Sequence, residues 1–189
     1  LFLMTFLAIV YGSAQELTPT LYQEEFNAAY VAYPNIPKGI LEGVAYAQTR
    51  IRHISGNNES CTGIPQVRGV MGLTENGQGY FNNNLEYVAR VSGYSVHEIK
   101  TNPATNIMAY AHAYSDLVSR KAVGLSDFSG HDQILKTLSE IPWNKNAGSD
   151  FALSCFTYEV FQFMNNPTFQ TAFELPARSV NLAAIYGAS

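Results

Sequence analysis

The sequence predicts a mainly α-helical domain, and three observations support this fold class. Apolar residues recur at intervals of three and four residues in several segments, which is the spacing of one face of a helix. Helix-start signals precede some of these segments: Ser95 and Glu98 match a capping box, and the pair Asn102-Pro103 opens another segment. No segment alternates apolar and polar residues as a half-buried strand would.

The expected helices follow one another and are separated by residues that interrupt helices. Pro34 and Pro37 interrupt the first apolar pattern, and Gly93 follows the third. Residues 55–84 are rich in Gly, Asn and Ser and have little periodicity, so we expect a long loop, of the kind that often carries function. The expected helices are 19–33, 37–54, 84–91, a short helix after Ser95, 104–121, 131–140 and 150–165.

The first residues match a secretory signal. Residues 1–10 are apolar, and Gly12-Ser13-Ala14 supplies the small residues of a cleavage site. The apolar stretch is shorter than the ~20 residues that a membrane-spanning helix needs. We therefore expect a secreted, periplasmic or cell-envelope protein, without stable membrane insertion once the signal remnant 1–14 is removed. Residues 15–166 would then form one domain, and residues 167–189 a C-terminal tail or linker.

The composition favours a neutral polymer as partner and excludes nucleic acid. Charged residues make up 14% of the chain, which contains 12 Tyr and 11 Phe. Aromatic rings supply apolar contact area with few rotamers to restrict, as carbohydrate binding requires. A net charge of −4 provides no basic face for phosphate groups.

The sequence gives no sign of a metal site or a cofactor. The four histidines are scattered, and neither a His-Glu-x-x-His pattern nor paired cysteines occur. Cys61 and Cys155 lie far apart. In an oxidising compartment they could form a disulfide, or each could remain a buried thiol.

Three segments in order resemble the lysozyme-like family of soluble lytic transglycosylases. The first is an apolar helix pattern that ends in Gln48-Thr49, and the second is Gly69-Val70-Met71-Gly72-Leu73. The third begins at Asn102-Pro103 and continues through Asn106-Ile107-Met108-Ala109-Tyr110-Ala111. The resemblance covers residues 27–166 and implies a mainly α, lysozyme-like domain whose long loop lines a glycan-binding cleft.

The resemblance also implies a site with an altered catalytic position. Gln48 occupies the position of the family's catalytic glutamate, and an amide has no proton to donate. Because general acid catalysis contributes a factor of about 10² to 10⁴, we expect binding of peptidoglycan glycan strands with little cleavage. The implied substrate-binding positions are Thr49, Met71, Gly72, Asn106, Tyr110 and Tyr158.

Two other acids keep an active muramidase or lytic transglycosylase as an alternative. Glu59 precedes Ser60 in the long loop, and Glu159 lies among aromatic residues, an environment that raises the pKa of a carboxyl group. Glu159 could instead pair with an arginine such as Arg50 or Arg68. Glu42 is rotated by about 120° from Gln48 on the same helix, so we expect it to face solvent or a neighbouring helix. A third alternative is a non-catalytic domain that serves structural interactions.

The start of the chain, the Cys61-Thr62-Gly63-Ile64-Pro65 segment and residues 69–73 also resemble the N-terminal part of exported bacterial N-acetylmuramoyl-L-alanine amidases. In those proteins a separate zinc domain cleaves the bond between muramic acid and the stem peptide. The resemblance implies that this chain holds the glycan strand and that an amidase domain follows residue 189.

Overall fold

The computed structural model describes residues 21–56, 66–75, 81–142 and 147–187, and these are mainly helical, as the sequence predicts. Two very short strands lie between the second and third helices. The elements are α1 (Gln23–Ala32), α2 (Ile40–Thr49), β1 (Val67–Arg68), β2 (Leu73–Thr74), α3 (Asn84–Ser92), α4 (Val96–Thr101), α5 (Pro103–Lys121), α6 (Phe128–Leu138), α7 (Ala147–Asn165), α8 (Pro167–Ala172) and α9 (Leu182–Tyr186).

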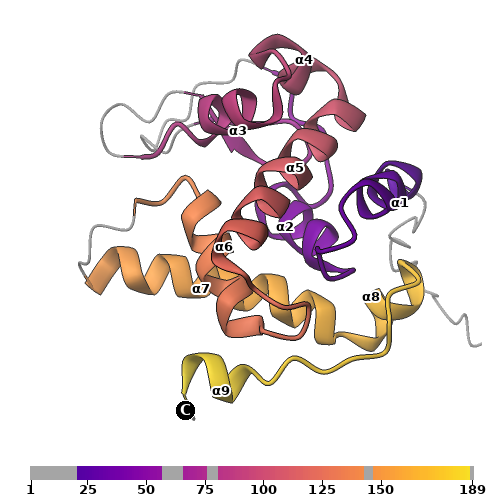
Figure 1. Ribbon diagram of the computed structural model, residues 1–189, viewed down its shortest axis with the longest axis vertical. Coiled ribbons are helices and arrows are strands. Elements are labelled where there is room, and N and C mark those ends of the chain that lie inside the picture. The colour runs from indigo at the N-terminus through magenta and orange to yellow at the C-terminus, as the bar shows by residue number, and fades with distance from the viewer. Residues whose placement is uncertain (1–20, 57–65, 76–80, 143–146, 188–189) are drawn as a thin grey trace, which may run out of the picture.

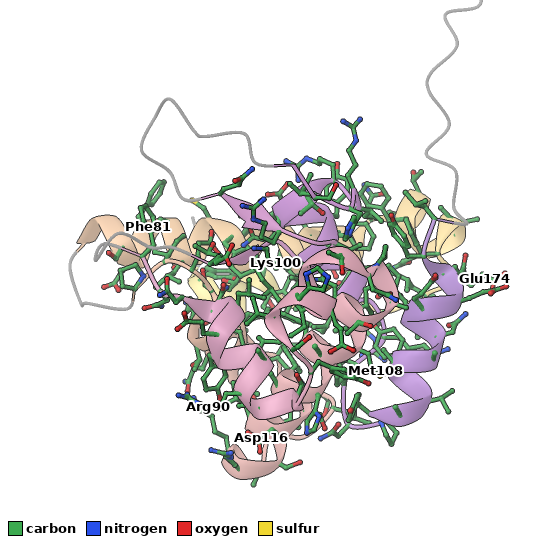
Figure 2. The ribbon with its side chains drawn as sticks, turned by 90° about the horizontal axis from the view of Figure 1, so that it is seen from above. Phe81, Arg90, Lys100, Met108, Asp116 and Glu174 are labelled. Carbon is green, nitrogen blue, oxygen red and sulfur yellow. The ribbon has the colours of Figure 1, made fainter. Side chains whose placement is uncertain are left out.

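Two long helices organise the molecule. Helix α5 contacts α1, α3, α4 and α6, and α7 contacts α2, α6, α8 and α9 (Figure 1). Apolar side chains of α5, such as Ile107, Tyr114 and Leu117, are buried among these neighbours. Charged side chains such as Arg90 and Glu174 lie at the periphery (Figure 2). The helical periodicity of the sequence therefore corresponds to burial of one face of the helices from α1 to α7, whereas α8 and α9 have no buried residue.

The helix ends that the sequence marks most clearly are confirmed. Ser95 accepts a hydrogen bond from the Glu98 backbone, and the Glu98 carboxylate accepts one from the Ser95 backbone, so the capping box is complete. Asn102 accepts a hydrogen bond from the Thr105 backbone N–H at 3.1 Å at the start of α5. Gly93 ends α3 in a left-handed conformation. These local signals need only neighbouring residues, which is why they can be recognised in the sequence.

Other boundaries differ from the prediction. Helix α2 ends at Thr49, five residues before the expected end, because Arg50 and Ile51 adopt left-handed backbone conformations. Helix α6 begins at Phe128, three residues before the expected start, because the Asp127 side chain accepts a hydrogen bond from the Gly130 N–H at 2.9 Å. The strands β1 and β2 were not expected: they pair antiparallel over two residues each, too few to show alternation.

The segment after Pro167, where the sequence predicts a tail or linker over residues 167–189, packs against the other helices in the described residues 167–187. Phe173 and Val180 are buried. The Asn165 side chain donates to the Val180 carbonyl at 2.9 Å and accepts from the Val180 N–H at 2.6 Å. The sequence does not predict this packing because Pro167 and Pro176 interrupt the segment and leave only short apolar runs.

Candidate functional site

Gln48 lies in the last turn of α2, where it contacts a residue from a distant part of the chain. Its side chain is partly buried, as its place on the apolar stripe predicts. The Nε2 group donates a hydrogen bond to Oε2 of Glu140 at 3.0 Å, across 92 positions in the sequence. The structure therefore places a carboxyl group directly beside the Gln48 amide.

Residues 69–73 lie across the end of α2 and the start of α5. The Thr49 hydroxyl contacts the Val70 carbonyl at 2.7 Å. The buried Asn106 side chain accepts a hydrogen bond from the Met71 N–H at 2.7 Å and donates one to the Ile99 carbonyl at 3.0 Å. Thr49 and Asn106 thus hold the backbone of this segment from two sides.

Two glycines allow this segment to approach its neighbours closely. Gly69 has φ +71°, and a Cβ atom placed there would lie 2.0 Å from Nδ2 of Asn106. Gly72 has φ +64°, and a Cβ atom placed there would lie 2.5 Å from Cβ of Gln48. Both positions require a left-handed backbone and leave no room for a side chain.

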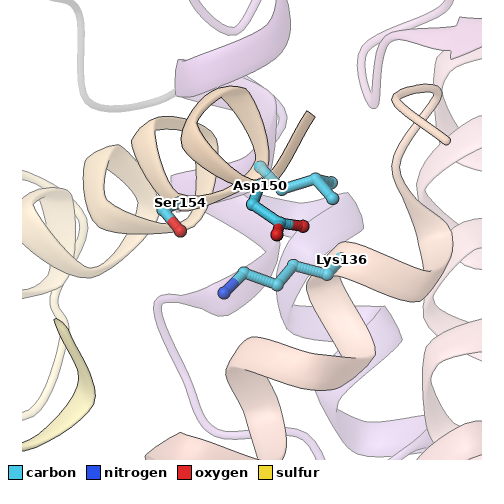
Figure 3. A pocket seen from close by; sticks show the side chains of 4 residues that line it. Lys136, Asp150 and Ser154 are labelled. Carbon is cyan, nitrogen blue, oxygen red and sulfur yellow. The ribbon is translucent and has the colours of Figure 1, made fainter. Parts of the chain in front are cut away.

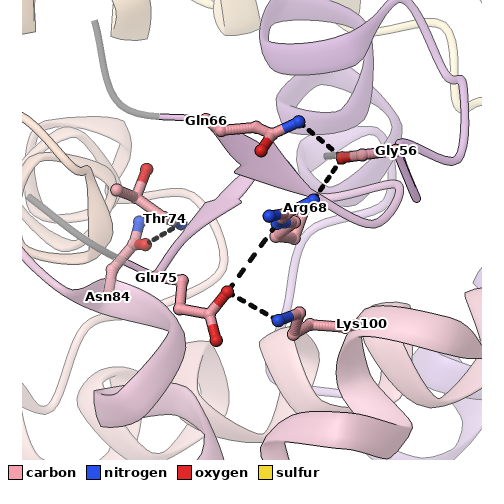
Figure 4. Close-up of polar contacts among 7 residues, drawn as sticks. All are labelled: Gly56, Gln66, Arg68, Thr74, Glu75, Asn84 and Lys100. Atoms are coloured by element: carbon pink, nitrogen blue, oxygen red, sulfur yellow. Dashed lines mark hydrogen bonds and ion pairs between the residues drawn. The ribbon is translucent and has the colours of Figure 1, made fainter. Parts of the chain in front are cut away.

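Charged residues fix the strand pair that flanks this segment (Figure 4). Glu75 accepts a hydrogen bond from Lys100 at 2.6 Å, and its carboxylate lies 3.8 Å from Nε of Arg68. Arg68 is largely buried and donates to the Gly56 carbonyl. Arg68 and Lys100 are therefore engaged near Glu75.

Two asparagines attach the end of α6 to the same region. Asn84 accepts a hydrogen bond from the Thr74 N–H at 2.6 Å (Figure 4) and donates one to the Leu138 carbonyl at 2.8 Å. The Asn82 backbone N–H donates to the Glu140 carbonyl at 2.7 Å, and its side chain donates to the Ser139 carbonyl at 3.1 Å. These bonds determine where the Glu140 backbone lies.

The environment of Glu140 favours a protonated carboxyl group. Burial raises the pKa of Glu140, and hydrogen bonds from Gln48 and Ser139 offset part of that rise. No lysine or arginine within the described residues pairs with it. Burial also raises the pKa of the Tyr110 hydroxyl, and the charge of Glu140 adds to that rise. Glu140 could not be recognised from the sequence, because an acid between Leu138 and Ile141 does not indicate a contact with α2.

The backbone directly after Gln48 and Thr49 is unusual. Arg50 and Ile51 have φ values of 54° and 58°, which residues other than glycine and asparagine seldom adopt. For the β-branched Ile51, which is buried, this conformation costs on the order of 1–3 kcal/mol. Strain of this kind is concentrated at functional sites, so it supports the assignment of a site at the end of α2.

The structure places the other candidate acids away from this role or outside the described residues. Glu159 forms an ion pair with Arg50 at 2.7 Å, the alternative that the sequence left open. Glu42 faces the neighbouring helix α1 and is buried, with Tyr30 donating to its carboxylate at 2.5 Å. Burial raises the pKa of Glu42. Glu59 lies outside the described residues.

Most of the expected substrate-binding residues are buried. Their side chains can shape the site, whereas a glycan could not lie directly on them. Tyr158 differs, since it is 43% exposed on α7 and packs edge-on against Tyr186, with ring centres 5.6 Å apart. The buried members are Thr49, Met71, Gly72, Asn106 and Tyr110.

A hollow of about 160 Å³ lies between α6 and α7 (Figure 3). Lys136, Asp150 and Ser154 line it. Lys136 forms an ion pair with Asp132 at 2.7 Å, and Asp132 also accepts a hydrogen bond from Thr157 at 2.6 Å. Because Asp132 neutralises Lys136 in this way, the hollow offers no unpaired cation to a ligand.

The part of the chain that the structure describes contains neither a cluster of metal ligands nor a membrane-spanning helix. Within it, no cluster of His, Cys, Asp and Glu could hold a metal ion. In the same residues, no helix is both long and apolar enough to cross a bilayer. Cys155 is exposed on α7, and Cys61 lies outside the described residues, so the disulfide remains a prediction.

Comparisons with family models, curated proteins and solved structures gave no match.

Proposed function

We propose that the chain is a lysozyme-like domain that binds peptidoglycan glycan strands, as part of an exported cell-envelope protein. The observation that carries this proposal is the junction of three segments that are distant in sequence: Gln48-Thr49, residues 69–73 and Asn106. These are the segments through which the sequence resembles lytic transglycosylases. The same order of three segments along a sequence could arise by chance. Direct hydrogen bonds among residues of those segments support the view that they form one site.

The groups at this junction suit a sugar ligand. The amide of Gln48 contains a donor and an acceptor, and its carbonyl oxygen accepts no hydrogen bond from a described residue. The Glu140 carboxyl has further lone pairs beyond those used by Gln48 and Ser139. Hydroxyl and N-acetyl groups of a glycan could bond to both. The low proportion of charged residues, 14%, agrees with a neutral polymer.

The role of Gln48 in this proposal is binding, because its amide cannot act as an acid. If the chain precedes an amidase domain, as the second resemblance implies, it would hold the glycan strand while that domain acts on the stem peptide. An interaction domain without affinity for glycan is the competing function.

The experiment is co-sedimentation of the purified protein with insoluble peptidoglycan. We expect the protein to sediment with the polymer and Gln48→Ala to weaken association about three- to tenfold, the effect of losing one or two hydrogen bonds. Gln133→Ala is the matched control, because Gln133 is an exposed glutamine on α6. Circular dichroism would establish that each variant is folded.

Each outcome decides the proposal. Sedimentation that depends on Gln48 and not on Gln133 supports the site. A folded protein that stays in the supernatant overturns glycan binding and favours the structural interaction domain. Equal binding by both variants and the unmodified protein overturns the location of the site at the end of α2.

A further inference from the structure

Glu140 differs from the other carboxylates near the proposed site in its partners. Glu75 contacts Lys100 at 2.6 Å, and Glu159 contacts Arg50 at 2.7 Å. Glu140 is instead hydrogen-bonded by two neutral groups, the Gln48 amide at 3.0 Å and the Ser139 hydroxyl at 3.3 Å. A carboxyl group without a neighbouring cation keeps its proton more easily than a paired one.

Both contacts reach the same oxygen of Glu140. Gln48 and Ser139 donate to Oε2. In the neutral acid that oxygen acts as the acceptor, so the proton lies on Oε1. The two donors therefore fix the orientation of the carboxyl group and leave its acidic O–H directed away from them.

The position of Glu140 is also fixed by its backbone. Asn82 binds the Ser139 and Glu140 carbonyls, and Asn84 binds the Leu138 carbonyl. An acid held by its backbone and its side chain loses little freedom when it reacts, which is the arrangement that proton transfer requires. Its side chain is partly buried rather than fully enclosed, so a ligand bound at Gln48 would lie beside it.

We propose that Glu140 is the general acid of a glycosidic cleavage at this site, with Gln48 as its positioning residue. This inference rests on the proposed function, since it needs a glycan strand at the end of α2. In this proposal the Gln48 amide does not stand in for a lost acid; it orients an acid supplied by the segment that follows α6. The raised pKa of Glu140 supports this role, because a general acid must be protonated near the working pH.

The Glu140 carboxyl group and one hydroxyl group account for the proton and the electron pair that the cleavage moves. Glu140 gives its proton to the oxygen that bridges two sugars, the bond between that oxygen and the anomeric carbon breaks, and the oxygen keeps the electron pair. A hydroxyl oxygen, from water or from the same sugar, then bonds to the anomeric carbon and loses its proton to the Glu140 carboxylate. Water gives a reducing end, and a hydroxyl of the same sugar gives a ring-closed product.

The test is a digest of insoluble peptidoglycan by the full chain. Soluble fragments are analysed by mass spectrometry, and pellet association is scored in the same tubes. We expect the unmodified protein to release fragments and Glu140→Gln to release at least 100-fold fewer while still sedimenting, the low end of the contribution of a general acid. Glu86→Gln is the matched control and should release as much as the unmodified protein, because Glu86 is exposed on α3 and lies outside the proposed site.

A pH profile of the unmodified protein does not depend on any variant folding. Release should fall about tenfold per pH unit above the pKa of the essential acid. Sedimentation without fragments overturns the catalytic role of Glu140 and leaves the proposed function standing. Failure to sediment overturns both. Fragments that persist in Glu140→Gln also overturn the role, whether their ends are reducing or ring-closed.

Discussion

Gly72 lies against Gln48 so closely that a methyl group on Gly72 would come 2.5 Å from the Cβ atom of Gln48. This contact joins the segment 69–73 to the helix that carries the proposed site. We expect Gly72→Ala to displace Gln48 and to weaken both protein stability and peptidoglycan binding. The free energy of unfolding should fall by about 3 kcal/mol, from backbone strain and the clash together. Urea unfolding and co-sedimentation would measure the two effects.

Gly93→Ala is the matched control for this change. Gly93 also has a left-handed backbone, with φ +79°, but a Cβ atom there would meet no other atom within 4 Å. It should lose only the strain contribution, on the order of 1 kcal/mol, and keep full binding. Equal losses in the two variants would show that the contact with Gln48 has no role of its own.

Asn106 provides a test of how the segment 69–73 is held. Its amide donates to the Ile99 carbonyl and accepts from the Met71 N–H, and the side chain is fully buried. Asn106→Asp keeps the acceptor but loses the donor and places a carboxyl group against a carbonyl oxygen. We expect a loss of about 3 kcal/mol or more in unfolding free energy. Chemical denaturation at neutral pH would measure it.

Asn181→Asp is the corresponding control. Asn181 is exposed and uses only its oxygen, which accepts from the Ala184 N–H at 3.1 Å at the start of α9. A carboxylate makes the same cap equally well, so stability should change by less than about 0.5 kcal/mol. A stable Asn106→Asp protein would mean that the amide bonds do not hold this segment.

The parts of the fold that could be predicted are those determined by neighbours in the sequence. Asn102 and Thr105 form a cap, and Ser95 and Glu98 form a capping box, within four residues each. The end of α2 could not be predicted, because the left-handed Ile51 contradicts the preference of a β-branched residue. That conformation must be imposed by tertiary packing around its buried side chain.

The candidate site also contains residues that could be predicted from the sequence and residues that could not. Gln48, Thr49 and Asn106 could be selected by resemblance, and Gln48 also by its place on the apolar face of its helix. Glu140 could not, because its significance depends on a contact across 92 positions. The burial of Met71 and Tyr110 was equally hidden, since a motif does not distinguish a residue that touches a ligand from one that supports the site.

Because His131 is buried, we expect the protein to lose stability in mild acid. The His131 side chain is fully buried, and the Tyr114 hydroxyl lies 2.9 Å from its Nδ1. Burial lowers the pKa of His131 to about 4 from an ordinary value of 6.5. The unfolded chain therefore binds a proton that the folded protein does not, and stability falls as the pH falls from 6.5 to 4. The full difference is about 3 kcal/mol.

This prediction can be separated from the opposite effect of the buried acids. The raised pKa values of Glu42 and Glu140 make their contributions to stability fall as the pH rises. Comparing urea unfolding of the unmodified protein and His131→Leu at pH 7 and pH 4.5 cancels those contributions. The loss between the two pH values should be smaller in His131→Leu, whereas His97→Gln, at an exposed position, should behave as the unmodified protein. If His131→Leu loses as much stability between pH 7 and pH 4.5 as the unmodified protein does, His131 is not the cause of the loss.

Gln48→Glu places a second carboxyl group beside Glu140, where the amide now lies 3.0 Å away. Two carboxylates at this separation cannot both ionise without a large cost, so one of them should bind a proton to a higher pH than either would alone. Because the folded protein then binds more protons than the unfolded chain, the variant should lose stability as the pH rises above about 4.5, the ordinary pKa of glutamate. Thermal unfolding should show near-normal stability at pH 4 and a loss of about 1–3 kcal/mol at pH 8.

Gln133→Glu adds the same charge at an exposed site on α6 and should show no such pH dependence. If Glu140 is the acid of the site, the shared proton should also extend fragment release to higher pH in Gln48→Glu, and an unshifted profile would mean that the two groups are not coupled.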